Sequence, residues 1–142
     1  MKAVHLQIPA DADYIDLVRN CLLGVATKLG FSYEDIEDMK VAVSEACSNA
    51  VLHGTREDGG GNAVIDVAFE ANGERLMIRV VNYGNPFAHA DARKSASSIQ
   101  GDQPSELRVG GLGIYLMEAL MDEVQMNSDE QRTEVRLMKY RG

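Results

Sequence analysis

The dipeptide Asn72-Gly73 lies between two segments of alternating apolar and polar residues, and it constrains the fold more than any other feature of this sequence. Asn-Gly between two strand-like segments is the strongest short signal for a β-hairpin. The flanking segments, about residues 63–70 and 75–82, are therefore expected to be neighbouring antiparallel strands. Any fold proposed for the chain must contain this pair.

Helical spacing of apolar residues predicts two helices before the hairpin. The first is expected to start at a cap on Asp11 or Asp13 and to end at Gly30, where glycine suits a left-handed helix end. The second begins after Ser32, a capping residue, and stops at Gly54.

The second half of the chain combines a long irregular segment with a glycine-rich helix start. Residues 83–109 show little periodicity, and loops of this length are commonly lids or mobile segments. Residues 110–113 (GGLG) then open a third helix, whose apolar stripe runs as far as Val124. Residues 2–8 and 133–140 alternate, and they predict the first and last strands.

The predicted fold class is α+β. In this order of elements, hairpin-linked strands can form a mostly antiparallel sheet with three helices on one face, a two-layer α/β sandwich. The 142 residues suit one domain without a repeat or a second domain, with a long lid at about residues 85–110.

Charge and hydropathy exclude two classes of partner. A net charge of −8 argues against a nucleic-acid-binding surface, which needs a positive field. No apolar run approaches the roughly 20 residues that cross a bilayer, and the N-terminus lacks the apolar core of a signal peptide, so a cytoplasmic protein is expected. Cys21 and Cys47 fall in helical patterns and are interpreted as free buried thiols.

Glu45 and Asn49 are candidate site residues because they lie one turn apart at the edge of the apolar stripe of the second helix. A carboxylate and a carboxamide in this arrangement can share a cation and a water molecule. Taken alone, the pair fits ordinary polar positions on an amphipathic helix better than a site. The core-facing stripe itself consists of Ile36, Met39, Val43, Ala46, Cys47 and Ala50.

The glycines at 110–113 are a candidate anion site. Glycine lets the backbone approach an anion closely, and the free N–H groups of the first helical turn point toward it. The segment is neither a Walker loop, since no Gly-Lys-Ser/Thr follows, nor a Rossmann fingerprint, since a loop rather than a strand precedes it. A simple glycine hinge before a helix is the alternative.

Four segments together resemble one family. Residues 43–54 (VSEACSNAVLHG), 82–84 (NYG), 111–118 (GLGIYLME) and 121–124 (MDEV) are similar, in this order, to the anti-sigma-factor serine-protein kinases of the RsbW and SpoIIAB type. These kinases belong to the GHKL (Bergerat-fold) ATPase superfamily. The resemblance runs nearly end to end and is closer to the RsbW type, so it implies a single GHKL-type ATP-binding kinase domain over residues 1–142.

The resemblance implies a role for each motif residue in binding Mg-ATP. Glu45 would be the general base that accepts the proton of the attacking hydroxyl, and Asn49 would ligate Mg²⁺ through its carboxamide oxygen. The other implied contacts are the backbone of Gly111 and Gly113 around the phosphates, Thr133 reaching adenine through water, and Arg108 as a lid arginine that contacts phosphate, one position from the usual register.

Asn82 departs from the family pattern, which has aspartate at this position to accept a hydrogen bond from the adenine amino group. Asparagine can accept the same bond, but a neutral bond is roughly half as strong as a charge-assisted one. A loss of about 1–2 kcal/mol predicts roughly 5- to 30-fold weaker nucleotide binding. Gly84 would keep its place as the close-approach glycine under the base.

The resemblance also implies partners. They are an alternative sigma factor, which such proteins sequester, and a small STAS-domain anti-anti-sigma protein, which they phosphorylate on serine, usually as homodimers. Arg19 matches a partner-contact position; a solvated arginine is the alternative. Two further hypotheses stay open, namely a binding module that keeps the fold without phosphorylating and the ATPase half of a histidine kinase, although no helix with a phosphorylatable histidine is evident.

Overall fold

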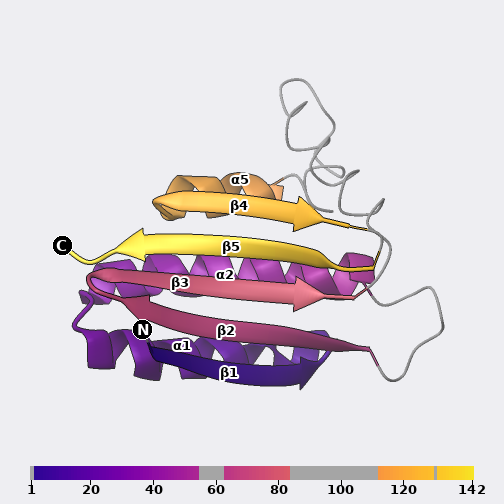
Figure 1. Ribbon diagram of the computed structural model, residues 1–142, viewed down its shortest axis with the longest axis horizontal. Coiled ribbons are helices and arrows are strands. Elements are labelled where there is room, and N and C mark those ends of the chain that lie inside the picture. The colour runs from indigo at the N-terminus through magenta and orange to yellow at the C-terminus, as the bar shows by residue number, and fades with distance from the viewer. Residues whose placement is uncertain (1, 55–62, 84–111, 130) are drawn as a thin grey trace.

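The structure is a computed structural model that describes residues 2–54, 63–83, 112–129 and 131–142 (Figure 1). The predicted lid, which includes Arg108, and the predicted site residues Gly84 and Gly111 lie outside these residues. The elements are β1 (Lys2–Pro9), η1 (Ala12–Tyr14), α1 (Ile15–Leu29), α2 (Tyr33–Gly54), β2 (Val64–Asn72), β3 (Arg75–Asn82), α5 (Leu112–Leu120), β4 (Glu123–Ser128) and β5 (Thr133–Tyr140).

Five strands form one sheet in the order β1-β2-β3-β5-β4, and all four neighbouring pairs are antiparallel. Helices α1, α2 and α5 lie behind the sheet on one face, as Figure 1 shows, and α2, in the middle, contacts both α1 and α5. This arrangement confirms the predicted two-layer α+β sandwich.

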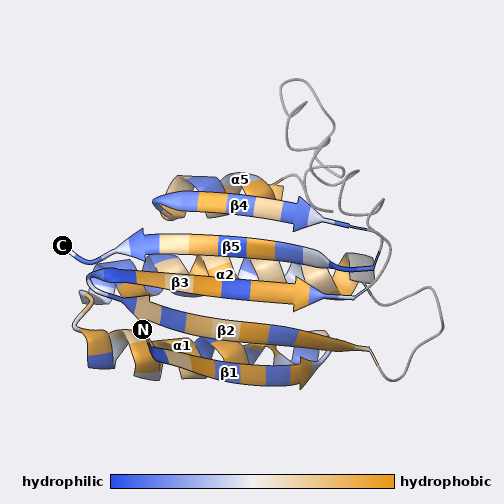
Figure 2. Cartoon of the chain, in the orientation of Figure 1, coloured by the Kyte–Doolittle hydropathy of each residue, from blue (hydrophilic) through white to orange (hydrophobic). Residues whose placement is uncertain are grey.

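The core lies between the sheet and the helices. Alternate residues of each strand point toward the helices, and Figure 2 shows the resulting alternation of polar and apolar segments along the strands. Ile65, Val67 and Phe69 of β2 are all almost completely buried in this layer. Burial of each such side chain contributes roughly 1.5–3 kcal/mol to stability.

The first two helix boundaries follow the capping chemistry of the sequence, with one change. Asp11 caps the short helix η1, where its carboxylate accepts a hydrogen bond from the Asp13 N–H, so α1 begins four residues later. Gly30 ends α1 with φ of 86°, a left-handed conformation that favours glycine. The Asp35 N–H donates to Ser32 Oγ over 3.1 Å, as the capping pattern predicted.

The hairpin is present, but its turn lies one residue later than predicted. Asn72 still pairs with Arg75 in the ladder, so the two turn residues are Gly73 and Glu74. Gly73 has φ of 65°, whereas Glu74 has a negative φ. A two-residue turn with glycine at its first position is typical of the type II′ turn. The hairpin therefore uses this turn rather than the type I′ turn that Asn-Gly at the two turn positions favours.

The prediction that the third helix continues to Val124 was wrong. Helix α5 ends at Leu120, and Glu123–Ser128 forms strand β4 beside β5. A side chain of β5 binds the end of this helix, because Lys139 Nζ donates to the Leu120 carbonyl oxygen over 2.8 Å. Val124 does contact the core, but its side chain follows the alternation of a strand.

Candidate active site

Helix α2 carries Glu45 and Asn49 at the boundary between the core and the surface. The burial of Val43, Ala46 and Ala50 fixes the orientation of the helix. This orientation leaves Glu45 half-buried and Asn49 only 4% exposed. Both candidate residues therefore lie on the rim of the core, as the helical spacing predicted, rather than on a fully solvated face.

Gly113, in the first turn of α5, lies directly against these two side chains. A Cβ atom added to Gly113 would be 2.8 Å from Glu45 Oε1 and 3.6 Å from Asn49 Nδ2. Any residue larger than glycine would therefore displace the carboxylate. The structure thus brings the glycine-rich helix start and the Glu45–Asn49 pair together, although Asn49 and Gly113 are 64 positions apart in the sequence.

The Asn49 carboxamide is incompletely bonded. Its Nδ2 is the one buried side-chain nitrogen or oxygen, within the part of the chain that the structure describes, that has no hydrogen-bond partner. An unsatisfied buried polar group costs about 1–3 kcal/mol, so such a group usually has a functional reason. This free donor beside the glycine start of α5 fits a polar ligand at this point.

Asn82 and Thr133 form a second group of predicted site residues, at the end of the sheet where α2 ends and α5 begins. They are cross-strand partners in β3 and β5, and their side chains are 4% and 1% exposed. Because Val80 of β3 points into the core, the alternation also directs Asn82 toward the helices. Figure 1 shows the end of β3, the start of β5, the end of α2 and the start of α5 toward one end of the molecule.

Arg19 of α1 lies on the other side of Glu45. Its Nη1 donates to Ser44 Oγ over 3.0 Å, and the Ser44 hydroxyl donates to the Lys40 carbonyl oxygen over 2.7 Å. A cleft of about 270 Å³ opens between α1 and α2 at this point. Its walls are formed by Arg19, Glu37, Lys40, Val41, Ser44 and Glu45.

Comparisons with known proteins show the family of the chain. Residues 8–139 match the histidine kinase-like ATPase domain family. The chain is 41% identical to the serine-protein kinase RsbW of Bacillus cereus (strain Q1) over 138 residues, which cover 96% of this chain and 84% of that protein, and equally to the RsbW of Bacillus anthracis. The chain belongs to the RsbW family of serine-protein kinases.

Two solved structures share the fold of this RsbW-family chain. The RsbU and RsbW domains of Rv1364c from Mycobacterium tuberculosis match with a TM-score of 0.71 and 22% identity, over 99% of this chain and 33% of that one. The SiaB–SiaC complex from Pseudomonas aeruginosa matches with a TM-score of 0.72 and 14% identity, over 95% and 88%. The family resemblance, the fold class and the serine-kinase class predicted from the motifs are confirmed.

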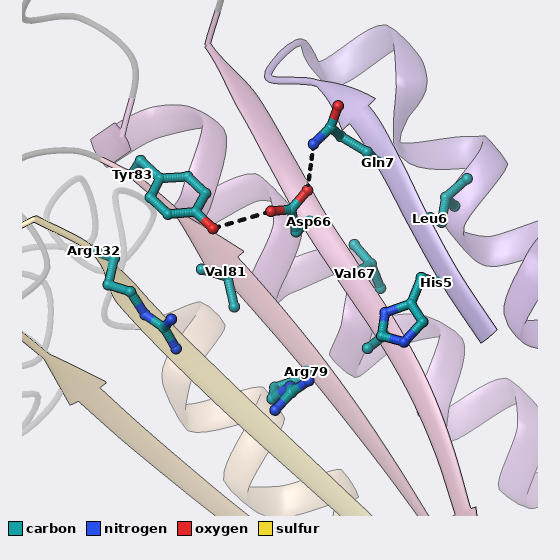
Figure 3. A pocket seen from close by; sticks show the side chains of 10 residues that line it. His5, Leu6, Gln7, Asp66, Val67, Arg79, Val81, Tyr83 and Arg132 are labelled. Carbon is teal, nitrogen blue, oxygen red and sulfur yellow. Dashed lines mark hydrogen bonds between the residues drawn. The ribbon is translucent and has the colours of Figure 1, made fainter. Parts of the chain in front are cut away.

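A cavity of about 470 Å³ lies on the face of the sheet opposite the described helices of this RsbW-family chain and contains none of the predicted site residues (Figure 3). Asp66 at its centre accepts hydrogen bonds from Gln7 Nε2 over 2.7 Å and Tyr83 Oη over 3.1 Å. Burial and the Asp66 carboxylate raise the pKa of Tyr83. The sheet separates this cavity from α2, the helix that carries Glu45.

The two cysteines of this RsbW-family chain are free, as predicted, but only Cys47 is buried, whereas Cys21 is half-buried. Burial raises the pKa of the Cys47 thiol to about 12, although the Arg19 charge opposes the shift. In the described residues, no group of three or more His, Cys, Asp or Glu side chains could hold a metal ion. In the same ranges, no helix has both the length and the apolarity needed to cross a membrane.

Proposed function

We propose that this chain transfers the γ-phosphoryl group of Mg-ATP to a serine of a STAS-domain anti-anti-sigma protein and sequesters an alternative sigma factor when that partner does not compete. The observation that carries the proposal is the contact of Gly113 with Glu45 and the incompletely bonded Asn49. A carboxylate, a carboxamide without a partner and a glycine at a helix start supply what a phosphate, its cation and an attacking hydroxyl need.

The residues present fit Mg-ATP. Magnesium binds through few protein oxygens and keeps phosphate oxygens and water as its other ligands, so Asn49 suffices as a protein ligand and no acidic cluster is required. The backbone of Gly113, and of Gly111 before it, would cradle the phosphates at the start of α5. When bound, the cation neutralises charge on the transferred group.

Glu45 supplies the proton acceptor. The serine Oγ bonds to the γ-phosphorus as the bond to the ADP oxygen breaks, and the hydroxyl proton passes to the Glu45 carboxylate. Glu45 is suited to this role because α5 lies on one side of it and the solvent-open cleft toward α1 on the other. General-base catalysis of this kind contributes about 10²–10⁴-fold to the rate.

Asn82 and Thr133 would bind the adenine, the first directly and the second through water. Both side chains are buried at adjacent positions of the sheet, which excludes bulk water from the base. Gly84 under the base and Arg108 from the lid complete the proposed nucleotide contacts. Because Asn82 replaces a charged acceptor, ATP is expected to bind more weakly than it would with aspartate.

Family membership supports the proposed partners. The Pseudomonas structure is a complex of SiaB with SiaC, an example of this fold bound to a second protein. For this chain the proposed partners are the sigma factor and the STAS-domain protein, in the cytoplasm, with a homodimer as the working state. Arg19, beside the proposed base, is the proposed partner contact on α1.

Transfer of labelled γ-phosphate from Mg-ATP to the STAS-domain protein tests the kinase proposal. Native protein is expected to label the acceptor, and Glu45→Gln is expected to label it at least about 100-fold more slowly while still binding ATP. Asp66→Asn, in the cavity on the opposite face, is the matched control and should transfer normally. Absence of transfer by native protein at millimolar ATP would refute the kinase proposal.

A binding module that sequesters its partner without phosphorylating is the second candidate, and Asn82 is the observation that favours it. The same assay separates the two. A native protein that binds the sigma factor but neither binds ATP nor labels the acceptor would establish the second candidate.

A further inference from the structure

A groove of about 410 Å³ lies between α1 and the strands β1 and β2, at the end of the molecule away from the proposed nucleotide site. Gly73, in the β2–β3 turn, borders the groove, whereas Asn82 lies at the other end of the same hairpin (Figure 1). A volume of this size is typical of sites for small molecules. The nucleotide chemistry proposed above uses none of the residues that line the groove.

The groove is apolar because α1 leaves part of the edge strand β1 uncovered. Val4 and Phe69 are cross-strand partners on the face toward the helices, yet Val4 is 44% exposed while Phe69 is 1% exposed. Val25 and Leu29, one turn apart on α1, are half-buried and line the groove as well. Phe69 thus forms the floor, and the three aliphatic side chains leave apolar surface that a bound alkyl chain would remove from water.

Two lysines border this apolar groove. Lys2 is the cross-strand partner of Ala71 on the face toward the helices, and Lys28 lies in the last turn of α1. In the part of the chain that the structure describes, neither lysine forms an ion pair, and no Asp or Glu lines the groove. Arg141 adds a cation at the end of α1, where its Nη1 donates to the Leu29 carbonyl oxygen over 3.2 Å. A chain with a net charge of −8 therefore has cations at the rim of this groove.

We propose that this groove binds a free long-chain alkyl carboxylate, with the alkyl chain over Phe69 and the carboxylate between Lys2 and Lys28. An apolar recess with cations only at its rim is complementary to a molecule with an apolar body and one anionic end. A bilayer fits less well, because the apolar side chains line a recess and the net charge opposes an anionic membrane surface. The site is separate from Glu45, so the inference does not depend on the proposed kinase function.

The test is calorimetric titration of the native protein with octanoate, decanoate and dodecanoate, each below the concentration at which it forms micelles. One molecule is expected to bind per chain. Each step of two CH₂ groups should tighten binding roughly 4- to 15-fold, because more apolar surface leaves water. Dodecyltrimethylammonium, which has the same alkyl chain and a cationic head, should bind about 10-fold more weakly than dodecanoate, because it lacks the contacts with the two lysines.

Variants of the rim and of the groove wall locate the ligand. Lys2→Gln and Lys28→Gln should each weaken dodecanoate binding about 2- to 5-fold, the effect of losing an exposed ion pair. Lys40→Gln is the matched control, because it removes the same charge outside the groove and should keep the native affinity. Ala71→Leu fills the groove with a side chain of the protein and should abolish binding, while circular dichroism shows a folded protein with native Tm.

Four results would overturn the proposal. They are the absence of dodecanoate binding to native protein, equal affinity for the cationic amphiphile, displacement of dodecanoate by Mg-ATP, and native affinity in all of Lys2→Gln, Lys28→Gln and Ala71→Leu. Titration with phosphatidylglycerol vesicles separates the two sources of an anionic alkyl chain. Binding to these vesicles without binding to monomeric dodecanoate would assign the groove to a lipid surface and overturn the assignment of a free carboxylate.

Discussion

Replacement of Gly113 by alanine should separate stability from catalysis. Gly113 has no positive φ, so alanine can adopt its backbone conformation without strain. The added Cβ would lie 2.8 Å from Glu45 Oε1, whereas ordinary contacts begin at 3.4 Å. The atom that must move is the end of a flexible side chain, so the fold can absorb the change while the carboxylate loses its place.

Two magnitudes follow for Gly113→Ala. Alanine is favoured over glycine in a helix by roughly 0.5–1 kcal/mol, so Tm should rise by about 1–4 °C. Misplacement of a catalytic group by something approaching 1 Å costs about 100-fold, so kcat for acceptor phosphorylation should fall about 10- to 100-fold.

Gly24→Ala is the matched control, because it lies in α1 and a Cβ there would meet no atom within 4 Å. It should give the same gain in Tm with an unchanged kcat. Thermal unfolding followed by circular dichroism and the acceptor-labelling assay measure both quantities on the same samples. A kcat for Gly113→Ala within about twofold of native would refute the placement of Glu45 as the base.

Three further changes test the rest of the site and the sheet. Calorimetry should show that Asn82→Asp binds ATP about 5- to 30-fold more tightly, and equal affinities would contradict the adenine contact. Asn49→Ala should lose Mg-dependent ATP affinity with little change in Tm, because its Nδ2 has no partner to lose, whereas a large drop in Tm would make it a structural residue. Although burial raises the pKa of Glu134, its hydrogen bond and ion pairs with Arg136 and Arg132 outweigh burial, so the net shift is downward. Its contribution to stability is therefore present above the unfolded pKa, about 4.3, and is lost as the pH falls through the lower folded pKa. The Tm difference between native and Glu134→Gln should shrink accordingly below about pH 4, and a difference independent of pH would contradict the ion pairs.

The parts of the fold predicted from the sequence are those fixed by local periodicity and capping. Strand β5 was predicted with its observed bounds, and Gly30 ends α1 as expected, because both signals lie within a few neighbouring residues. Strand β4 was missed because Val124 also fits a helical stripe. Its identity as a strand depends on pairing with β5 and on a bond from Lys139, which are long-range interactions.

In the candidate site, too, some features follow from local geometry and others depend on contacts between distant segments. The helical spacing placed Glu45 and Asn49 on one rim, since positions on a single helix follow from its geometry. The bond between Arg19 and Ser44 joins two helices, and no signal in either segment indicates which side chains meet across them. Ser44 therefore did not emerge as a candidate, although it lies next to Glu45 in the sequence.

The two ends of the proposed site should affect different kinetic constants, and this decides how Asn82 is interpreted. The adenine does not change during phosphoryl transfer, so a contact from Asn82 is the same in the ground state and the transition state. Weakening such a contact raises KM for ATP and leaves kcat unchanged. Glu45, with Gly113 against it, is the proposed proton acceptor, so a change there is expected to lower kcat. Asparagine at position 82 is therefore compatible with a fully active kinase wherever ATP exceeds the raised KM, and kcat at saturating ATP, rather than affinity, tests whether the chain is a kinase.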